Sequence, residues 1–397
     1  MKRFANKCVK EKQVRNVDFW RLMEAYMTYL GGDYYEADRE FKNIKETLTT
    51  DNKTFAEQID VFRLALKISS LEDEIDGEDE DEIGDIIRDN PLYWKYKDFP
   101  DFINDKLAHV YDKMDEKGKA FRVHHTLKVL KMKPDREIID DLLKICRKED
   151  KSNLEEALVK KDNLATIEND LLMLRGMMLF NGGQMEAALE AFRDVPRNFR
   201  EPWNKFNPFH EHFIDCINCP VNDTLIYEQA GVIEKMLELE YQGRAHLRDG
   251  AGAFYQLGNA YYNMSYFGDS WNLMDSFRSG KNWKYTNKEN RYITAESELG
   301  NIELMNLDKA RRYYNTTLEL AKNPELAARA CFMLAKCDLN DFYLDPETEY
   351  THYNNEVPRV PEEYFKHYAK LIDEYSETEF YKMVIEECKF FEAYALN

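Results

Sequence analysis

The sequence predicts an all-α protein, an α-solenoid in which helical hairpins stack one after another. Apolar residues recur at spacings of three and four, as in Phe19, Leu22, Met23, Tyr26 and Leu30, and this is the period of an amphipathic helix. Only 11 prolines and 16 glycines occur in 397 residues, so few positions interrupt such helices. The alternation of β-branched residues that marks strands is nearly absent.

Taken in chain order, the pattern divides the chain into four parts. We expect N-terminal helical hairpins over 1–71, an acidic loop over 72–89, a helical segment over 90–165 and a helical repeat domain over 166–397. Beyond the helix that includes Phe19, helical patterns cover 102–116, 136–146, 153–180, 224–242, 253–264, 293–304, 307–321, 325–337, 363–375 and 379–394.

The acidic loop is predicted from charge density. Ten of the 14 residues in 72–85 are acidic, and like charges at this density repel and favour an extended, solvated chain. A calcium site of the EF-hand type is not expected, because placing Gly77 at the sixth loop position puts Ile83 at the twelfth, where a carboxylate is required. Pro91 and Pro100 mark the boundaries that follow, since the residue before a proline is biased away from the helical conformation.

Net charge and termini limit the function classes. The charge of −20 excludes binding of nucleic acid over a broad surface, because acidic surfaces repel phosphates. No apolar run is long enough for a membrane span. Seven scattered cysteines argue against a disulfide framework. The basic N-terminus lacks the apolar stretch of a secretory signal, which taken by itself predicts a cytoplasmic protein.

An internal repeat gives the hairpin prediction its main support. Residues 31–41 (GGDYYEADREF) align with residues 182–192 (GGQMEAALEAF), and both have a Gly-Gly pair, a bulky residue, a small Ala and a Phe at matching positions. Glycine permits the reversal after a first helix, and the Ala lets the second helix approach it closely. Related patterns occur at 254–261, at 306–314 followed by Asn323-Pro324, and at 364–380.

These residues resemble tetratricopeptide (TPR) repeats, whose signature W-x2-L-G-x2-Y…A-x3-F…P extends over about 34 residues. The Trp position of that signature holds Arg21, Leu172 and Phe254 here, and the spacing between copies is irregular. The resemblance covers mainly 19–45 and 170–397. It implies antiparallel helical hairpins that bind protein partners on a concave face.

The C-terminal half contains five further distinctive segments: 207–209 (NPF), 215–219 (DCINC), 258–268 (GNAYYNMSYFG), 332–337 (FMLAKC) and 375–381 (YSETEFY). Together they resemble the C-terminal part of large uncharacterised TPR-like envelope proteins of Bacteroidetes-type bacteria. That resemblance implies an exported or surface-associated helical scaffold, at the periplasm or outer membrane, with no assigned chemistry. The last hairpin is similar to TPR lipoproteins that assemble outer-membrane machinery.

Two groups of residues are candidates for a site. His210, His212, Cys216 and Cys219 are ligand types that zinc prefers, but all four lie within ten residues, whereas structural zinc sites draw ligands from two separated places. A disulfide or redox pair, or a structural loop, would explain the cysteines as well. Tyr255, Tyr261, Tyr262 and Tyr266 form the second group, since tyrosines pack cores and also dominate binding hot spots.

The sequence therefore predicts a non-catalytic protein-interaction scaffold that needs no cofactor. No Walker loop, Gly-x-Gly-x-x-Gly or His-Glu-x-x-His motif occurs. A concave face would capture a helix or an extended peptide of a partner, and the acidic surface would favour a basic one. Two alternatives remain open at this point. One is a metal or redox protein built on the cluster that includes His210 and Cys219, and the other is a purely structural module of a larger complex.

Overall fold

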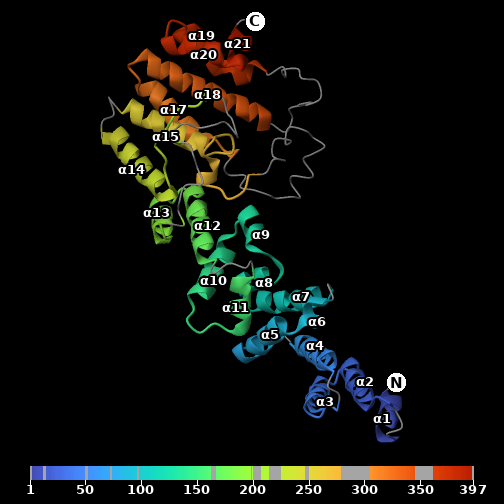
Figure 1. Ribbon diagram of the computed structural model, residues 1–397. Helices are drawn as coiled ribbons and strands as arrows, with labels where there is room; N and C mark the ends of the chain where they lie inside the picture. Colours follow the sequence, from blue (N-terminus) through green and yellow to red (C-terminus); the bar gives the residue numbers. More distant parts are fainter. Residues whose placement is uncertain are drawn as a thin grey trace. The chain divides into compact units, whose positions relative to one another are not determined.

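In the computed structural model every regular element of the described residues is a helix, so the predicted all-α fold is confirmed there (Figure 1). The chain divides into two compact units. Unit 1 comprises Met1–Leu130 and Asp135–Leu171, and unit 2 comprises Lys131–Pro134 and Leu172–Asn397. The structure describes residues 2–11, 15–49, 52–71, 74–95, 98–161, 167–197, 199, 207–213, 225–245, 250–278, 305–344 and 361–395.

Most of unit 1 is formed by the helices α1 to α11. One apolar cluster lies among α2, α3 and α4, and a second joins α4 to α5, α7, α8 and α11. The helices are α1 (Lys2–Glu11), α2 (Val17–Leu30), α3 (Tyr34–Glu46), α4 (Lys53–Ser70), α5 (Gly77–Asp89), α6 (Pro91–Lys95), α7 (Asp98–Lys113), α8 (Lys117–His124), α9 (Leu127–Met132), α10 (Arg136–Arg147) and α11 (Asn153–Lys160).

The helices α2 and α3 form the first hairpin that the Gly-Gly pattern predicts. Gly32 has a φ of +83°, in the left-handed region that favours glycine. Its amide donates to the Tyr29 carbonyl at 2.9 Å, which closes the turn. Ala37 and Phe41 on α3 are fully buried. The turn and the buried face of α3 therefore match the predicted pattern.

The predicted acidic loop is wrong over most of its length, because Gly77–Asp89 is the helix α5. The Asp76 side chain caps its first turn, where acidic residues interact favourably with the positive end of the helix dipole. Lys67 of α4 and Lys119 of α8 pair with carboxylates of α5 at 2.9 and 2.8 Å. Ile83 is fully buried. Cations from other helices thus offset the repulsion that local charge density predicts.

Unit 2 contains the remaining helices, except that the first four residues of α12 belong to unit 1. The predicted helix at 293–304 lies outside the described residues. The elements are α12 (Glu168–Asn181), α13 (Met185–Asp194), α14 (Gln229–Ala245), α15 (Ala251–Asn263), the 3-10 helix η1 (Trp271–Leu273), α17 (Asp308–Leu320), α18 (Pro324–Leu344), the 3-10 helix η5 (Glu362–Phe365), α19 (Lys366–Tyr375), α20 (Glu379–Glu387) and α21 (Lys389–Ala395).

The second Gly-Gly pair closes the hairpin of α12 and α13 in the same way as the first. Gly183 has a φ of +77°, and its amide donates to the Phe180 carbonyl at 2.9 Å. Phe192 of α13 is fully buried against Gly176 of α12, where an added Cβ would lie 2.5 Å from the ring. A small residue at this crossing is therefore required by the ring that packs on it.

Two further helix pairs of unit 2 use the same glycine–aromatic contact. An added Cβ at Gly243 of α14 would lie 2.7 Å from the Phe254 ring of α15. An added Cβ at Gly258 of α15 would lie 2.5 Å from the Tyr314 ring of α17. The contact thus recurs along α12 to α17, although only the α12–α13 copy carries the Gly-Gly turn.

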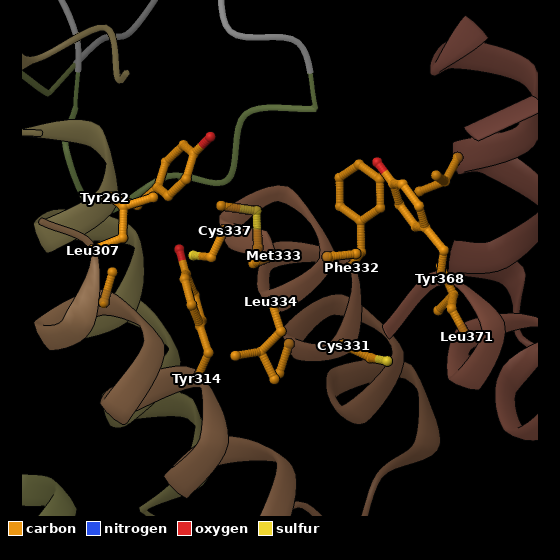
Figure 2. Packing of buried hydrophobic residues seen from close by; sticks show 14 of the residues in the cluster. Tyr262, Leu307, Tyr314, Cys331, Phe332, Met333, Leu334, Cys337, Tyr368 and Leu371 are labelled. Carbon is orange, nitrogen blue, oxygen red and sulfur yellow. The ribbon is translucent and has the colours of Figure 1, made fainter. Parts of the chain in front are cut away.

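The helix α18 lies within an apolar cluster of unit 2. Its consecutive residues Phe332, Met333 and Leu334 are all fully buried, so the helix is covered around its circumference there. Figure 2 shows Tyr314 of α17 on one side of this helix and Tyr368 of α19 on the other. Such a helix is a rigid support for side chains that leave the core.

Candidate functional site

A short non-helical segment of unit 2, residues 207–213, forms the centre of the candidate site. It opens with a turn in which the Asn207 side chain accepts from the Phe209 amide at 3.0 Å and the His210 amide donates to the Asn207 carbonyl at 3.2 Å. The first three residues of the segment are buried, whereas His210 is exposed. One side of the 207–213 segment is therefore covered by helices and part of it faces solvent.

Two asparagines of α15 hold the main chain of the 207–213 segment. The Asn263 amide group donates to the carbonyls of Pro208 at 2.9 Å and His210 at 2.7 Å. The Asn259 amide group donates to the Phe209 carbonyl at 3.2 Å. The two asparagines are four residues apart and so lie on one face of the helix. Three consecutive carbonyls are thus bound, and these hydrogen bonds do not involve the side chains of the segment.

The helix α18 contributes two cations to the same segment. Arg329 Nη1 donates to Glu211 Oε2 at 2.8 Å, and the Tyr255 hydroxyl of α15 donates to the same oxygen. Lys336 Nζ donates to the His212 carbonyl at 2.7 Å. Arg329 and Lys336 are seven residues apart, two turns along one face of α18. Burial, and then the negative charge of Glu211, raise the pKa of Tyr255, so its hydroxyl remains a donor at neutral pH.

The contacts follow an order along α15. Asn263 binds the carbonyls on both sides of Phe209, Asn259 binds the Phe209 carbonyl, and Tyr255 binds the Glu211 carboxylate. The 207–213 segment therefore runs antiparallel to α15. We call the side chains that contact it the α15–α18 face; they are Tyr255, Asn259, Asn263, Arg329, Phe332 and Lys336, with Phe380 of α20 beside them.

Two phenylalanines anchor the segment in apolar surroundings. Phe209 is buried in a cluster of unit 2 and packs edge-on against Tyr227, with ring centroids 5.0 Å apart. Phe213 packs against Phe332 at 6.1 Å and Phe380 at 5.7 Å between centroids. The two anchors stand four residues apart with Glu211 midway. Aromatic anchors of this kind commonly supply most of the free energy of docking.

A second layer of residues fixes the side-chain orientation of Asn259 and the main chain that follows Asn263. The Tyr314 hydroxyl of α17 donates to Asn259 Oδ1 at 2.9 Å, which leaves the amide N–H of Asn259 for the segment. Tyr314 reaches this position because Gly258 has no side chain in its way. The Ser270 amide donates to the Asn263 carbonyl at 2.8 Å, which ties the chain after α15 back to its last turn.

The four tyrosines predicted for partner binding lie mainly in the core. Tyr255, Tyr262 and Tyr266 are 7%, 0% and 6% exposed. Tyr261 is partly buried and stacks on Tyr313, with centroids 5.5 Å apart. Of the four, Tyr255 contacts the 207–213 segment, through its hydroxyl. A direct role for these rings in binding a partner stays a prediction.

The predicted metal cluster is only partly within the described residues, since Cys216 and Cys219 lie outside them. His210 is exposed, and His212 Nδ1 lies 3.6 Å from Asp269 Oδ2. Among the residues that the structure describes, no group of three or more His, Cys, Asp or Glu side chains is placed to hold a metal ion. The histidines contribute main-chain carbonyls to the α15–α18 face instead.

A cavity of about 400 Å³ lies in unit 1. Its charged lining is internally paired. Lys119 lies 2.8 Å from Glu116 and 3.0 Å from Glu155, and Lys148 lies 2.7 Å from Glu155. Because the cations already contact carboxylates of the same cavity, this feature indicates a structural ion cluster more than a binding site.

The sequence carries a signal for the α15–α18 face that belongs to no recognised motif. Asn259 and Asn263 stand on one face of a helix whose other residues are mainly Ala, Gly and aromatic residues, although asparagine is a poor helix former. Arg329 and Lys336 likewise interrupt a run of Ala, Cys, Phe, Met and Leu in α18. Buried polar residues at helical spacing indicate a bound partner group, whether within the chain or outside it.

No family model, curated protein or solved structure matches the chain. Within the described residues, no helix combines the length and the apolar character needed to cross a membrane.

Proposed function

We propose that the chain is a non-catalytic protein-interaction scaffold of TPR-like helical hairpins, and that the α15–α18 face binds a non-helical peptide segment of a protein partner. The observation that carries the proposal is the set of hydrogen bonds from Asn259, Asn263 and Lys336 to main-chain carbonyls. Every peptide has such carbonyls, so side chains arranged this way can bind the main chain of another peptide.

The TPR-like assignment is supported by the glycine–aromatic contacts. Gly176 with Phe192, Gly243 with Phe254 and Gly258 with Tyr314 each bring a helix close to a following one. Repeated pairs of this type stack into solenoids, and solenoids present continuous binding faces. The resemblance to envelope proteins extends the proposal to a role within a bacterial envelope assembly.

A peptide-display library tests the proposal. Purified full-length protein should enrich peptides, and the double variant Asn259→Ala, Asn263→Ala should lose most of that enrichment because two carbonyl-binding side chains are gone. Asn315→Ala is the matched control, since Asn315 is exposed on α17 and contacts no part of the 207–213 segment. Enrichment that is equal in the wild type and the double variant would refute binding at this face.

A further inference from the structure

The contacts of the 207–213 segment fall into two kinds. Hydrogen bonds to carbonyls depend on main chain alone, whereas Glu211, Phe209 and Phe213 are bound through their side chains. The second kind specifies a pattern of aromatic, any residue, acidic, any residue, aromatic. A face that binds its own chain in this way has the same complementarity for a separate peptide, because none of the contacts requires covalent connection.

Arg329 of the α15–α18 face makes the acidic residue essential. Glu211 is mostly buried and receives both Arg329 and the Tyr255 hydroxyl. If the segment left, Arg329 would lose the carboxylate that it contacts, and leaving a partly buried charge without its partner is unfavourable. An incoming peptide must therefore bring a carboxylate to the same place. Local chemistry here favours an acidic ligand, the opposite of what the net charge of −20 suggests at long range.

We propose, resting on the proposed function, that the partner of this face is a peptide that forms the same turn and carries an acidic residue midway between two aromatic residues, and that the 207–213 segment is its built-in competitor. A tethered competitor acts at an effective concentration in the millimolar range, so partner binding is weakened until the segment is displaced. The apparent affinity falls in proportion to the fraction of molecules in which the face is open.

The test uses a fluorescein-labelled peptide with the sequence of residues 207–213, titrated with full-length protein and followed by anisotropy. Glu211→Lys places a positive charge against Arg329 and should release the internal segment. We expect this variant to bind the labelled peptide at least about tenfold more tightly than the wild type does. A peptide in which Lys replaces the Glu should bind the variant at least about tenfold more weakly than the Glu peptide.

Two further variants keep the test specific. Glu319→Lys makes the same charge change at an exposed position of α17 and should leave peptide binding at the wild-type level. The charge swap Glu211→Lys, Arg329→Glu restores an internal pair and should return binding of the Glu peptide to the wild-type level or below. Circular dichroism melting of each variant identifies any that fail to fold, and in that case Phe213→Ala replaces Glu211→Lys as the releasing change.

The outcomes separate this inference from the proposed function. If folded Glu211→Lys binds neither peptide but still enriches other library peptides in an Asn259-dependent way, the specificity inference fails and the scaffold proposal stands. Equal binding of the Glu and Lys peptides also overturns the inference. If no peptide binds the wild type or the released variant in either assay, both proposals fail.

Discussion

Two buried polar clusters, one in each unit, differ in the groups that they bind. In unit 1 the ammonium of Lys119 lies 2.8 Å from Glu80 and 3.0 Å from Glu155, and Tyr111 and Ser152 donate to Glu80. Each of these partners is a side chain of a helix or of a helix cap. In unit 2 the buried asparagines of α15 and the cations of α18 bind mainly main-chain carbonyls of a non-helical segment.

This difference separates a structural cluster from a candidate binding face. A network that joins side chain to side chain fits one set of residues, so it stabilises one arrangement of helices. Hydrogen bonds to carbonyls do not depend on the side chains of the bound segment, so the same side chains can accept a different occupant. Perturbing each network should therefore affect stability most in unit 1 and binding most in unit 2.

The largest expected effect is in the ion cluster of unit 1. Lys119→Met leaves Glu80 and Glu155 buried without their shared cation, and we expect a loss of about 3–5 kcal/mol in the free energy of opening of α5, α8 and α11. Hydrogen exchange of peptides from these helices in the full chain measures it. Lys144→Met, which removes an exposed pair with Asp141, should cost less than about 1 kcal/mol. Equal losses in the two variants would contradict a structural role for the cluster.

The second effect concerns the packing that supports the α15–α18 face. Gly258→Ala would place a methyl group 2.5 Å from the Tyr314 ring, and we expect unit 2 to lose about 1–3 kcal/mol, seen as faster exchange in α15 and α17. Gly252→Ala on the same helix meets no atom within 4 Å, so it should be neutral or slightly stabilising. A tolerated Gly258→Ala would mean that Tyr314 can move without cost.

The third effect compares the two Gly-Gly hairpins. Gly32 in unit 1 and Gly183 in unit 2 both have positive φ, so Gly32→Ala and Gly183→Ala should each cost about 1–2 kcal/mol. Thermal melting of each variant, with exchange in α3 or α13, measures the loss. Gly77→Ala, at a glycine without positive φ or a neighbour within 4 Å, is the control and should be neutral or stabilising. A large difference between the two hairpins would show that their turns are not equivalent.

The smallest effect is a pH dependence in unit 1. Burial alone would raise the pKa of Glu155, but hydrogen bonds from Lys148, the Ser152 amide and Lys119 lower it below its ordinary value. The stability that Glu155 contributes is therefore complete above the ordinary carboxyl pKa of about 4.3 and is lost as the pH falls through the lowered value. The difference in melting temperature between the wild type and Glu155→Gln should decrease as the pH is lowered from 6 to 3. A constant difference would exclude this origin.

Much of the fold was predictable because its signals are local. The turn at Gly32, the burial of Phe41 and the equivalent features at Gly183 and Phe192 depend on residues within about ten positions of one another. The helix α5 was not predicted, because its acidic side chains are offset by Lys67 and by Lys119, and the pairing of separate helices is not visible in charge density along the chain.

The candidate site was predictable only in part. The sequence predicted His210 and His212 as candidate metal ligands and the Tyr255 ring as a candidate contact for a partner. The structure instead uses the carbonyls of the two histidines and the hydroxyl of the tyrosine. The role of Asn259 depends on Tyr314, which is 55 residues away and sets the direction of its amide.

The sequence by itself determined that this chain is helical, where its Gly-Gly turns lie and which residue patterns repeat, because helix period and glycine turns arise from neighbours along the chain. Tertiary structure alone decided that an acidic stretch becomes a helix and that two asparagines and two cations meet one non-helical segment. Such contacts join residues 44 to 124 positions apart, as for Tyr255 with Glu211 and Lys336 with His212, and only packing brings them together.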